Sequence, residues 1–167
     1  MMKFTKGFTL IEMLTIIAII GILATMVVVN VSGARIRARD TKRLADVKSI
    51  QNALEMYFYK TKTYPSDTND NPLVNCGGIS IADLGVELGP YLETIPTDPQ
   101  PITNAAFCGA QNYWYSYDTA TSTYQVWFAL EQDPGAPLGN AQQFIDSSCP
   151  NGVEANDRYC YVLKGKK

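Results

Sequence analysis

The chain has 167 residues, enough for about one globular domain, and a formal net charge of −2. This charge provides no basic footprint of the kind that binds nucleic acid, so nucleic acid is not indicated as a partner. The sequence contains no histidine, which excludes histidine-dependent triads, histidine general bases and histidine metal sites.

The first predicted element is an apolar segment, residues 8–31, that follows a short leader carrying Lys3 and Lys6. The segment is long enough to cross a bilayer as a helix, which takes roughly 20 apolar residues. The basic leader predicts a cytoplasmic N-terminus and a C-terminal part on the outer side of the membrane. A cleavable secretory signal has a shorter apolar core followed by a small-residue cleavage site, and this pattern fits poorly here. We therefore expect the segment to stay in the mature protein.

Glu12 is the only charged residue in this segment. A carboxylate near the bilayer centre costs about 2.5–3.5 kcal/mol on insertion scales, and the segment contains no Lys or Arg to pair with it. Cleavage between Gly7 and Phe8 would create an α-amino group four residues before Glu12. This amine can neutralise Glu12 of a neighbouring subunit, which predicts assembly through the N-terminal helix. A plain signal anchor is the alternative; it explains the apolar segment but not Glu12.

The run KGFTLIEMLTIIAIIGILATMVVVN closely resembles the N-terminal signature of type IV pilins and type II secretion pseudopilins. The resemblance implies cleavage by a prepilin peptidase after Gly7 and N-methylation of Phe8. It also implies that Glu12 meets the N-terminal amine of an adjacent subunit. One position departs from the family, because Val29 stands where many members have a proline before Asn30. Without this proline the helix is expected to bend or melt less at that point.

A single helix is predicted from about residue 8 to residue 60, because no proline occurs before the Tyr64-Pro65 pair. The predicted organisation is a leader at 1–7, a transmembrane and assembly helix at 8–31, an amphipathic continuation at 32–62 and an extracytoplasmic headpiece at 63–167. The continuation has an apolar face at Ile36, Leu44, Val47, Ile50, Leu54 and Tyr57. Its polar side is predicted to carry Arg43, Asp46, Lys48, Gln51 and Glu55.

A basic cluster lies at the start of this continuation: Arg35, Arg37, Arg39, Lys42 and Arg43. We expect a solvated helix face near the lipid headgroups. The alternative is contact with acidic residues of neighbouring subunits or with an anionic substrate.

The headpiece is predicted to contain a small antiparallel sheet packed on the helix. The stretch YWYSYDTATSTYQVWFALE, residues 113–131, indicates two strands joined by a turn, since Tyr124, Val126, Phe128 and Leu130 alternate with other residues. Residues 159–163 add a last strand. The expected fold class is therefore α+β, with a pilin-like headpiece. The runs YPSD and GPYLETIPTDP resemble segments of major pseudopilins of type II secretion.

The four cysteines are Cys76, Cys108, Cys149 and Cys160, spaced too widely for a CxxC motif. In an exported module they are expected to form disulfides, and three pairings are open. The favoured pairing joins Cys149 to Cys160 and Cys76 to Cys108. Pilins often carry a C-terminal disulfide loop, so the cysteines favour a surface pilin.

Calcium is the one cofactor that the resemblance suggests, because major pseudopilins commonly bind it. The candidate ligands are Asp133 and Asp146, but a hard cation needs about six to eight oxygens and the rest of the set is not evident. An ordinary polar turn is the favoured interpretation. No phosphate loop, nucleophile elbow or zinc motif is present, so nothing indicates an enzyme.

The sequence therefore predicts a structural subunit of a type IV pilus-like filament or of a type II secretion pseudopilus. Its expected partners are other copies of itself, a prepilin peptidase, an assembly ATPase, a platform membrane protein and, before assembly, membrane lipid. It is expected to be a single-pass protein of the cytoplasmic membrane that later forms a periplasmic or extracellular filament. The alternative is an anchored extracytoplasmic binding domain or enzyme. Secretion, adhesion, motility and DNA uptake remain open as roles.

Overall fold

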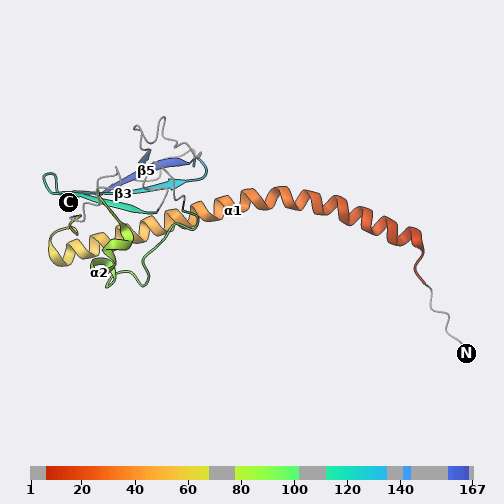
Figure 1. Ribbon diagram of the computed structural model, residues 1–167, viewed down its shortest axis with the longest axis horizontal. Coiled ribbons are helices and arrows are strands. Elements are labelled where there is room, and N and C mark those ends of the chain that lie inside the picture. The colour runs from red at the N-terminus through yellow and green to blue at the C-terminus, as the bar shows by residue number, and fades with distance from the viewer. Residues whose placement is uncertain (1–6, 68–77, 102–111, 135–140, 144–157, 166–167) are drawn as a thin grey trace, which may run out of the picture. The chain divides into compact units, whose positions relative to one another are not determined.

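The computed structural model describes residues 7–67, 78–101, 112–134, 141–143 and 158–165 (Figure 1). Side chains at 27–30 lie outside this description. The chain forms two compact units, Met1–Ile36 and Arg37–Lys167. Helix α1, Leu10–Thr61, begins in the first unit and continues into the second.

The described part of the first unit is the N-terminal part of α1 and the short segment before it. The helix begins at Leu10, two residues after the predicted start, because Thr9 caps it. Its backbone continues as a helix through Val29 and Asn30. This continuity agrees with the expectation that the chain melts less where the proline is missing.

In the second unit, α1 buries the predicted apolar face. Val47, Ile50 and Leu54 are at most 3% exposed and belong to the headpiece core. The helix ends at Thr61, and Lys62 follows in the left-handed region with φ 65°. The Lys62 N–H donates to the Phe58 carbonyl at 2.8 Å, which satisfies one of the last helical carbonyls. The predicted helix end is confirmed to within one residue.

The headpiece sheet has five antiparallel strands in the order β1-β2-β3-β5-β4. The bounds of the strands are Ile79–Ser80 for β1, Trp114–Asp118 for β2, Thr123–Leu130 for β3, Ala141–Gln143 for β4 and Tyr159–Gly165 for β5. The predicted pair of strands and the last strand are confirmed. The four predicted core residues of β3 are at most 1% exposed, and burial alternates as predicted from Thr123 to Phe128. Ala129, which was predicted on the other face, is buried as well. The fold class is α+β, as predicted from the sequence.

Two short helical elements complete the headpiece: the 3-10 helix η1, Ile81–Leu84, and α2, Gly85–Leu88. Their apolar residues Ile81, Leu84 and Leu88 join the same core as α1 and the sheet. In Figure 1 the sheet and α2 both lie along the C-terminal half of α1. The sequence did not predict η1, α2, β1 or β4.

Tyrosines make up much of this core, and their hydroxyl groups are hydrogen-bonded. The bonds run from Tyr113 to Asp46 at 2.8 Å, from Tyr115 to the Pro65 carbonyl at 2.8 Å, and from Tyr124 to Glu55 at 3.0 Å. Burial, helped by Glu55, also raises the pKa of Tyr64 to about 12. A buried tyrosine needs such a partner for its hydroxyl, so these bonds fix how the sheet sits on α1.

Candidate functional site

The start of α1 is a capping box formed by Thr9 and Glu12. The Thr9 N–H and the Thr9 hydroxyl both donate to Glu12 Oε2, at 2.8 and 2.9 Å. In return, the Glu12 N–H donates to the Thr9 hydroxyl at 3.3 Å. This is the Thr-x-x-Glu pattern in which two residues satisfy otherwise unpaired amides of the first helical turn. The cap was not predicted from the sequence, although residues 9–12, Thr-Leu-Ile-Glu, match the Thr-x-x-Glu pattern.

Within the described residues, only one oxygen of the Glu12 carboxylate is used. Both bonds that the Glu12 carboxylate accepts end on Oε2, and both come from Thr9 of the same chain. Thr15 does not contact the carboxylate, since its hydroxyl donates to the Glu12 main-chain carbonyl at 2.9 Å. The other carboxylate oxygen, Oε1, is therefore open to a donor from outside the chain.

Gly7 and Phe8 lie directly before the capping box, outside the helix and exposed. Phe8 is 75% exposed, and a side chain at Gly7 would meet nothing within 4 Å. The predicted cleavage point therefore lies in accessible chain outside the helix, just before its first residue, Leu10. Cleavage there would place the new amine at the open end of the helix, close in sequence to Glu12.

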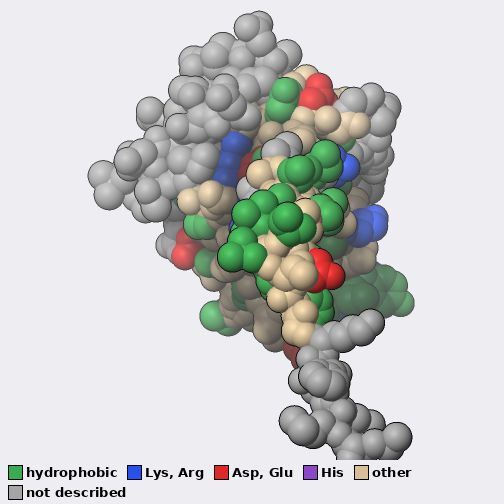
Figure 2. Space-filling view, turned by 90° about the vertical axis from the view of Figure 1, so that its right-hand side faces the viewer, with side chains coloured by type: hydrophobic (Ala, Val, Ile, Leu, Met, Phe, Trp, Pro, Cys, Tyr) green, Lys and Arg blue, Asp and Glu red, His purple; other side chains and the backbone are tan. Residues whose placement is uncertain are grey.

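The helix that follows is apolar on all sides and unburied. Its large hydrophobic side chains from Leu10 to Met26 are 42–81% exposed, and they are prominent on the helix surface in Figure 2. The Thr25 hydroxyl is satisfied within the helix, donating to the Ile22 carbonyl at 2.7 Å. Among the described residues, α1 is the one helix long and apolar enough to cross a membrane. A helix apolar all round needs lipid or partner helices around it.

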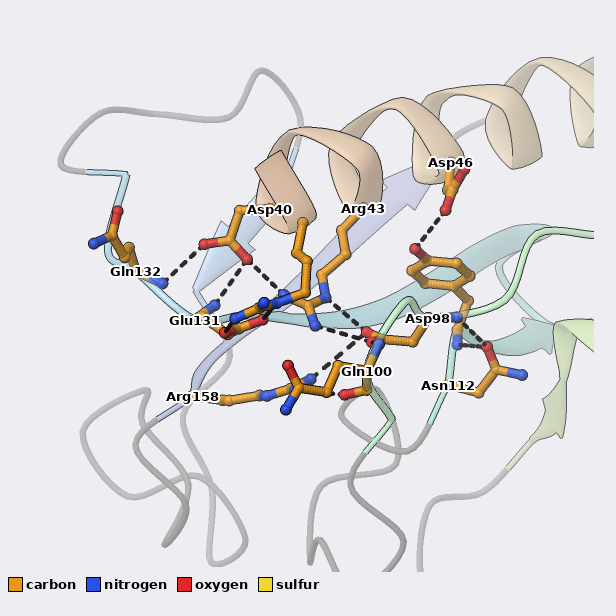
Figure 3. Close-up of polar contacts among 11 residues, drawn as sticks. Asp40, Arg43, Asp46, Asp98, Gln100, Asn112, Glu131, Gln132 and Arg158 are labelled. Carbon is orange, nitrogen blue, oxygen red and sulfur yellow. Dashed lines mark hydrogen bonds and ion pairs between the residues drawn. The ribbon is translucent and has the colours of Figure 1, made fainter. Parts of the chain in front are cut away.

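The predicted basic cluster is not one solvated face. Arg43 is fully buried, which corrects its predicted place on the polar side of the helix. Its guanidinium donates to three carboxylates: Nε to Asp98 at 2.7 Å, Nη1 to Asp40 at 2.7 Å and Nη1 to Glu131 at 2.6 Å. Figure 3 shows these groups converging beneath α1. Arg39 is also engaged, with its Nε donating to Glu131 at 2.7 Å.

We call Asp40, Arg43, Asp98 and Glu131 the Arg43 cluster; it joins α1 to two distant loops. Asp40 accepts the main-chain N–H groups of Glu131 and Gln132, at 3.0 and 2.9 Å, and so holds the end of β3. Asp98, from the IPTDP run, also accepts the Gln100 N–H at 2.6 Å. The cluster therefore fixes both loops against the helix. Arg35, Arg37 and Lys42 remain exposed, as predicted.

The charges of the Arg43 cluster stabilise one another. Burial alone lowers the pKa of Arg43, but the hydrogen bonds to Asp98 and Glu131 more than offset this and raise it above its ordinary value. The hydrogen bond from Arg39 lowers the pKa of Glu131 to about 2, despite the opposing effect of burial. Arg43 and Glu131 therefore stay ionised at neutral pH.

The predicted disulfide and calcium residues lie partly outside the described residues. Cys160 is buried in β5 and is disulfide-bonded, whereas Cys76, Cys108 and Cys149 lie outside the description, so the pairing stays a prediction. Of the calcium candidates, Asp146 also lies outside it. Asp133 is bonded to Tyr161, whose pKa rises to about 12, mainly through burial and also through this contact. No group of three metal-binding side chains occurs in the part of the chain that the structure describes.

The comparisons with known proteins agree with the signature identified in the N-terminal sequence. A family profile described as "Prokaryotic N-terminal methylation motif" matches residues 2–28. Type IV wide pilus major component PilA4 of Thermus thermophilus is 32% identical over 149 residues, which cover 89% of this chain and 97% of that protein. The chain belongs to the type IV pilin and pseudopilin family. The recognition made from the N-terminal signature is thereby confirmed.

Proteins of the pseudopilin branch of the family also match the chain. Type II secretion system core protein G of Aeromonas hydrophila is 35% identical over 95 residues, covering 56% of this chain and 66% of that protein. Core protein G of Klebsiella pneumoniae is 31% identical over 99 residues, covering 59% of this chain and 71% of that protein. The chain thus spans just under two thirds of the length of the Aeromonas protein. No solved structure shows a significant match to the chain.

Proposed function

We propose that this chain is a structural subunit of a type IV pilus-like filament or type II secretion pseudopilus. In this proposal a prepilin peptidase cleaves after Gly7, Phe8 becomes the methylated N-terminus, and the subunits polymerise through the N-terminal part of α1. The helix first holds the subunit in the membrane and then exchanges lipid contacts for contacts with other helices. An assembly ATPase and a platform membrane protein would drive this exchange. The headpiece lies on the outer side of the membrane throughout.

One observation carries the proposal. Glu12 lies at the start of an exposed apolar helix, and only one of its two carboxylate oxygens accepts a hydrogen bond within the described residues. Thr9 satisfies Oε2 of Glu12, and the segment contains no Lys or Arg that could reach Oε1. A free amine on Phe8 of a neighbouring subunit supplies the missing donor and cancels the charge. Because such a charge is costly in lipid, the pairing favours the filament over the isolated subunit.

The test replaces Glu12 by leucine in the full chain, co-expressed with the peptidase and the assembly proteins. We expect normal membrane insertion and cleavage, with filament yield reduced to background. Thr15→Val is the matched control, since it removes a polar group one turn later and leaves the charge in place. Filaments formed normally by the Glu12→Leu variant would contradict the proposal and favour the alternative, in which the helix only anchors a binding domain or enzyme.

Pilus and pseudopilus remain two forms of one proposal. The YPSD and IPTDP runs favour a pseudopilus, and the second of them supplies Asp98 to the Arg43 cluster. The cysteines and the nearly full-length match to PilA4 favour a pilus. Electron microscopy of the cell surface separates the two, because a pilus extends from the cell and a pseudopilus at native expression does not.

A further inference from the structure

The start of β5 is held by two contacts of different chemistry. Arg158, the residue before β5, is 3% exposed; its Nη2 donates to the Gln100 carbonyl at 2.5 Å, and its Nη1 lies 3.6 Å from Asp98 Oδ2. We call these contacts of Arg158 with Asp98 and Gln100 the Arg158 latch. Cys160, two residues further along the chain, is completely buried and disulfide-bonded. An ionic contact and a covalent bond therefore hold the same end of one strand.

The Arg158 latch is continuous with the Arg43 cluster. The Asp98 side chain is completely buried, and its two oxygens accept Nε of Arg43 at 2.7 Å and Nη2 of Arg43 at 2.9 Å. Figure 3 shows Arg43 reaching Asp98 from α1 and Arg158 reaching it from the other side. Arg158 therefore ties β5 to the same carboxylate that ties the IPTDP run to α1.

The first two residues of β5 are the less supported end of this strand. Within the described residues β4 pairs with residues 161–163 alone, so Tyr159 and Cys160 have a ladder partner in β3 but none in β4. A strand end with a ladder on one side opens more readily than a strand centre with ladders on both sides. The disulfide and the Arg158 latch lie where this opening would begin.

Opening of this strand end disturbs both contacts together. Because Cys160 is completely buried, a reductant reaches its disulfide only after the strand end has opened. Two residues of a strand span only about 7 Å, so a displacement of Cys160 also draws Arg158 away from Asp98 and Gln100. The disulfide and the Arg158 latch therefore favour one and the same closed state.

We propose that the Cys160 disulfide and the Arg158 latch form a redox-linked lock that closes the start of β5 on the loop held by α1. Reduction of the disulfide lets the strand end open, and Arg43 is then the one arginine left on Asp98. In return, the closed latch protects the disulfide from reduction, because coupling between two contacts is reciprocal. The role of the lock in the cell rests on the proposed function, which places the headpiece on the outer, oxidising side of the membrane.

The first test measures how fast dithiothreitol reduces the Cys160 disulfide in the native full chain in detergent. One thiolate of dithiothreitol attacks the disulfide and its second thiol displaces the bound cysteine, so the products are two cysteine thiols and the cyclic disulfide of dithiothreitol. Iodoacetamide traps the freed Cys160, which is quantified in its peptide by mass spectrometry. We expect Arg158→Met to raise the reduction rate roughly tenfold, because methionine fills similar space but makes neither polar contact.

Two control variants separate opening of the strand end from general loss of stability. Lys164→Met changes an exposed residue near the other end of β5 and should leave the reduction rate unchanged. Ile50→Val weakens the core on α1 without touching β5, and it should also leave the rate unchanged if reduction needs only the strand end to open. An unchanged rate for Arg158→Met, or an equal increase for Ile50→Val, would overturn the lock.

The second test measures the coupling in the opposite direction by denaturant unfolding. Arg158→Met is made in the unaltered chain and in a Cys160→Ser chain whose freed partner thiol is alkylated. We expect the shift in the unfolding midpoint to be roughly twofold or more larger with the disulfide than without it, because the strand end is already open in the serine chain. Equal shifts in the two chains would overturn the lock.

These outcomes are separate from those that test the proposed function. Both experiments use the purified full chain and need no filament, so their failure overturns the lock and leaves the proposed function standing. Normal filaments of the Glu12→Leu variant would overturn the proposed function, whereas a tenfold faster reduction of Arg158→Met would still support the lock.

Discussion

Replacement of Arg43 by methionine tests how the headpiece is held on α1. Arg43 is fully buried, and the carboxylates of Asp98, Asp40 and Glu131 around it are 0%, 12% and 16% exposed. Methionine keeps most of the side-chain length, so packing changes contribute little. The variant instead leaves three neighbouring carboxylates without their shared cation. Removal of one partner from a buried ion pair costs about 3–5 kcal/mol, and we expect a loss of this size in the free energy of unfolding.

The assay is denaturant unfolding of the full chain in detergent, followed by tryptophan fluorescence. Both tryptophans, Trp114 and Trp127, lie in the headpiece sheet, so the signal reports this unit and not the apolar helix. Lys48→Met is the matched control: it removes the same charge from an exposed position on α1 and should cost less than about 0.5 kcal/mol. A loss below about 1 kcal/mol for Arg43→Met would show that the Arg43 cluster does not hold the two loops on α1.

The pH dependence of this loss gives an independent check. In the unaltered chain the pKa of Glu131 is lowered to about 2, so its stabilising contribution is complete above pH 4.5 and is lost as the pH falls toward 2. In the Arg43→Met variant Glu131 keeps its bond from Arg39 but loses the bond from Arg43, so its pKa is lowered less. The difference in unfolding free energy should therefore shrink as the pH falls from about 4.5 toward 2. A constant difference over this range would contradict the electrostatic explanation.

Four further predictions concern the headpiece. Gly165→Ala places a Cβ about 2.0 Å from the Tyr124 ring, so we expect a loss of about 1–3 kcal/mol in the same unfolding assay, and an unchanged midpoint would refute the contact. Cys160→Ser removes a disulfide and should lower the free energy of unfolding by about 2–5 kcal/mol. A reducing agent should destabilise the unaltered chain and barely affect the variant. Peptide mapping without reduction should link Cys160 to Cys149, and a link to Cys76 or Cys108 would reject the favoured pairing. The calcium hypothesis predicts that a chelator lowers the thermal unfolding midpoint, and an unchanged midpoint would remove Asp133 and Asp146 from consideration.

Local patterns in the sequence were sufficient for the main elements of the fold. The end of α1 was predictable because Tyr64-Pro65 cannot continue a helix, and β3 was predictable because Tyr124, Val126, Phe128 and Leu130 recur at every second position of an eight-residue strand. β1 and β4 have only two and three residues, too few for a period of two to be recognised. They form because neighbouring strands pair with them, and a local pattern does not contain that information.

The Arg43 cluster shows a different limit. Arg43 lies four residues before Val47, on the same helical stripe as Ile50 and Leu54, so its burial had a signal in the spacing. Arg43 was nevertheless predicted to lie on the polar side of the helix, because lysine and arginine are almost never fully buried unless they are paired. The partners that permit its burial, Asp98 and Glu131, lie 55 and 88 residues away in the sequence. Only the fold brings them together.

The mass of the mature chain shows whether Phe8 becomes its N-terminus. The chain would be purified from the membranes of its host, or from cells that also express a prepilin peptidase, and its intact and N-terminal masses measured. The account predicts a chain that begins at methylated Phe8 and lacks residues 1–7. A chain that keeps residues 1–7 in the presence of active peptidase would contradict it, because no amine would then be available for Glu12.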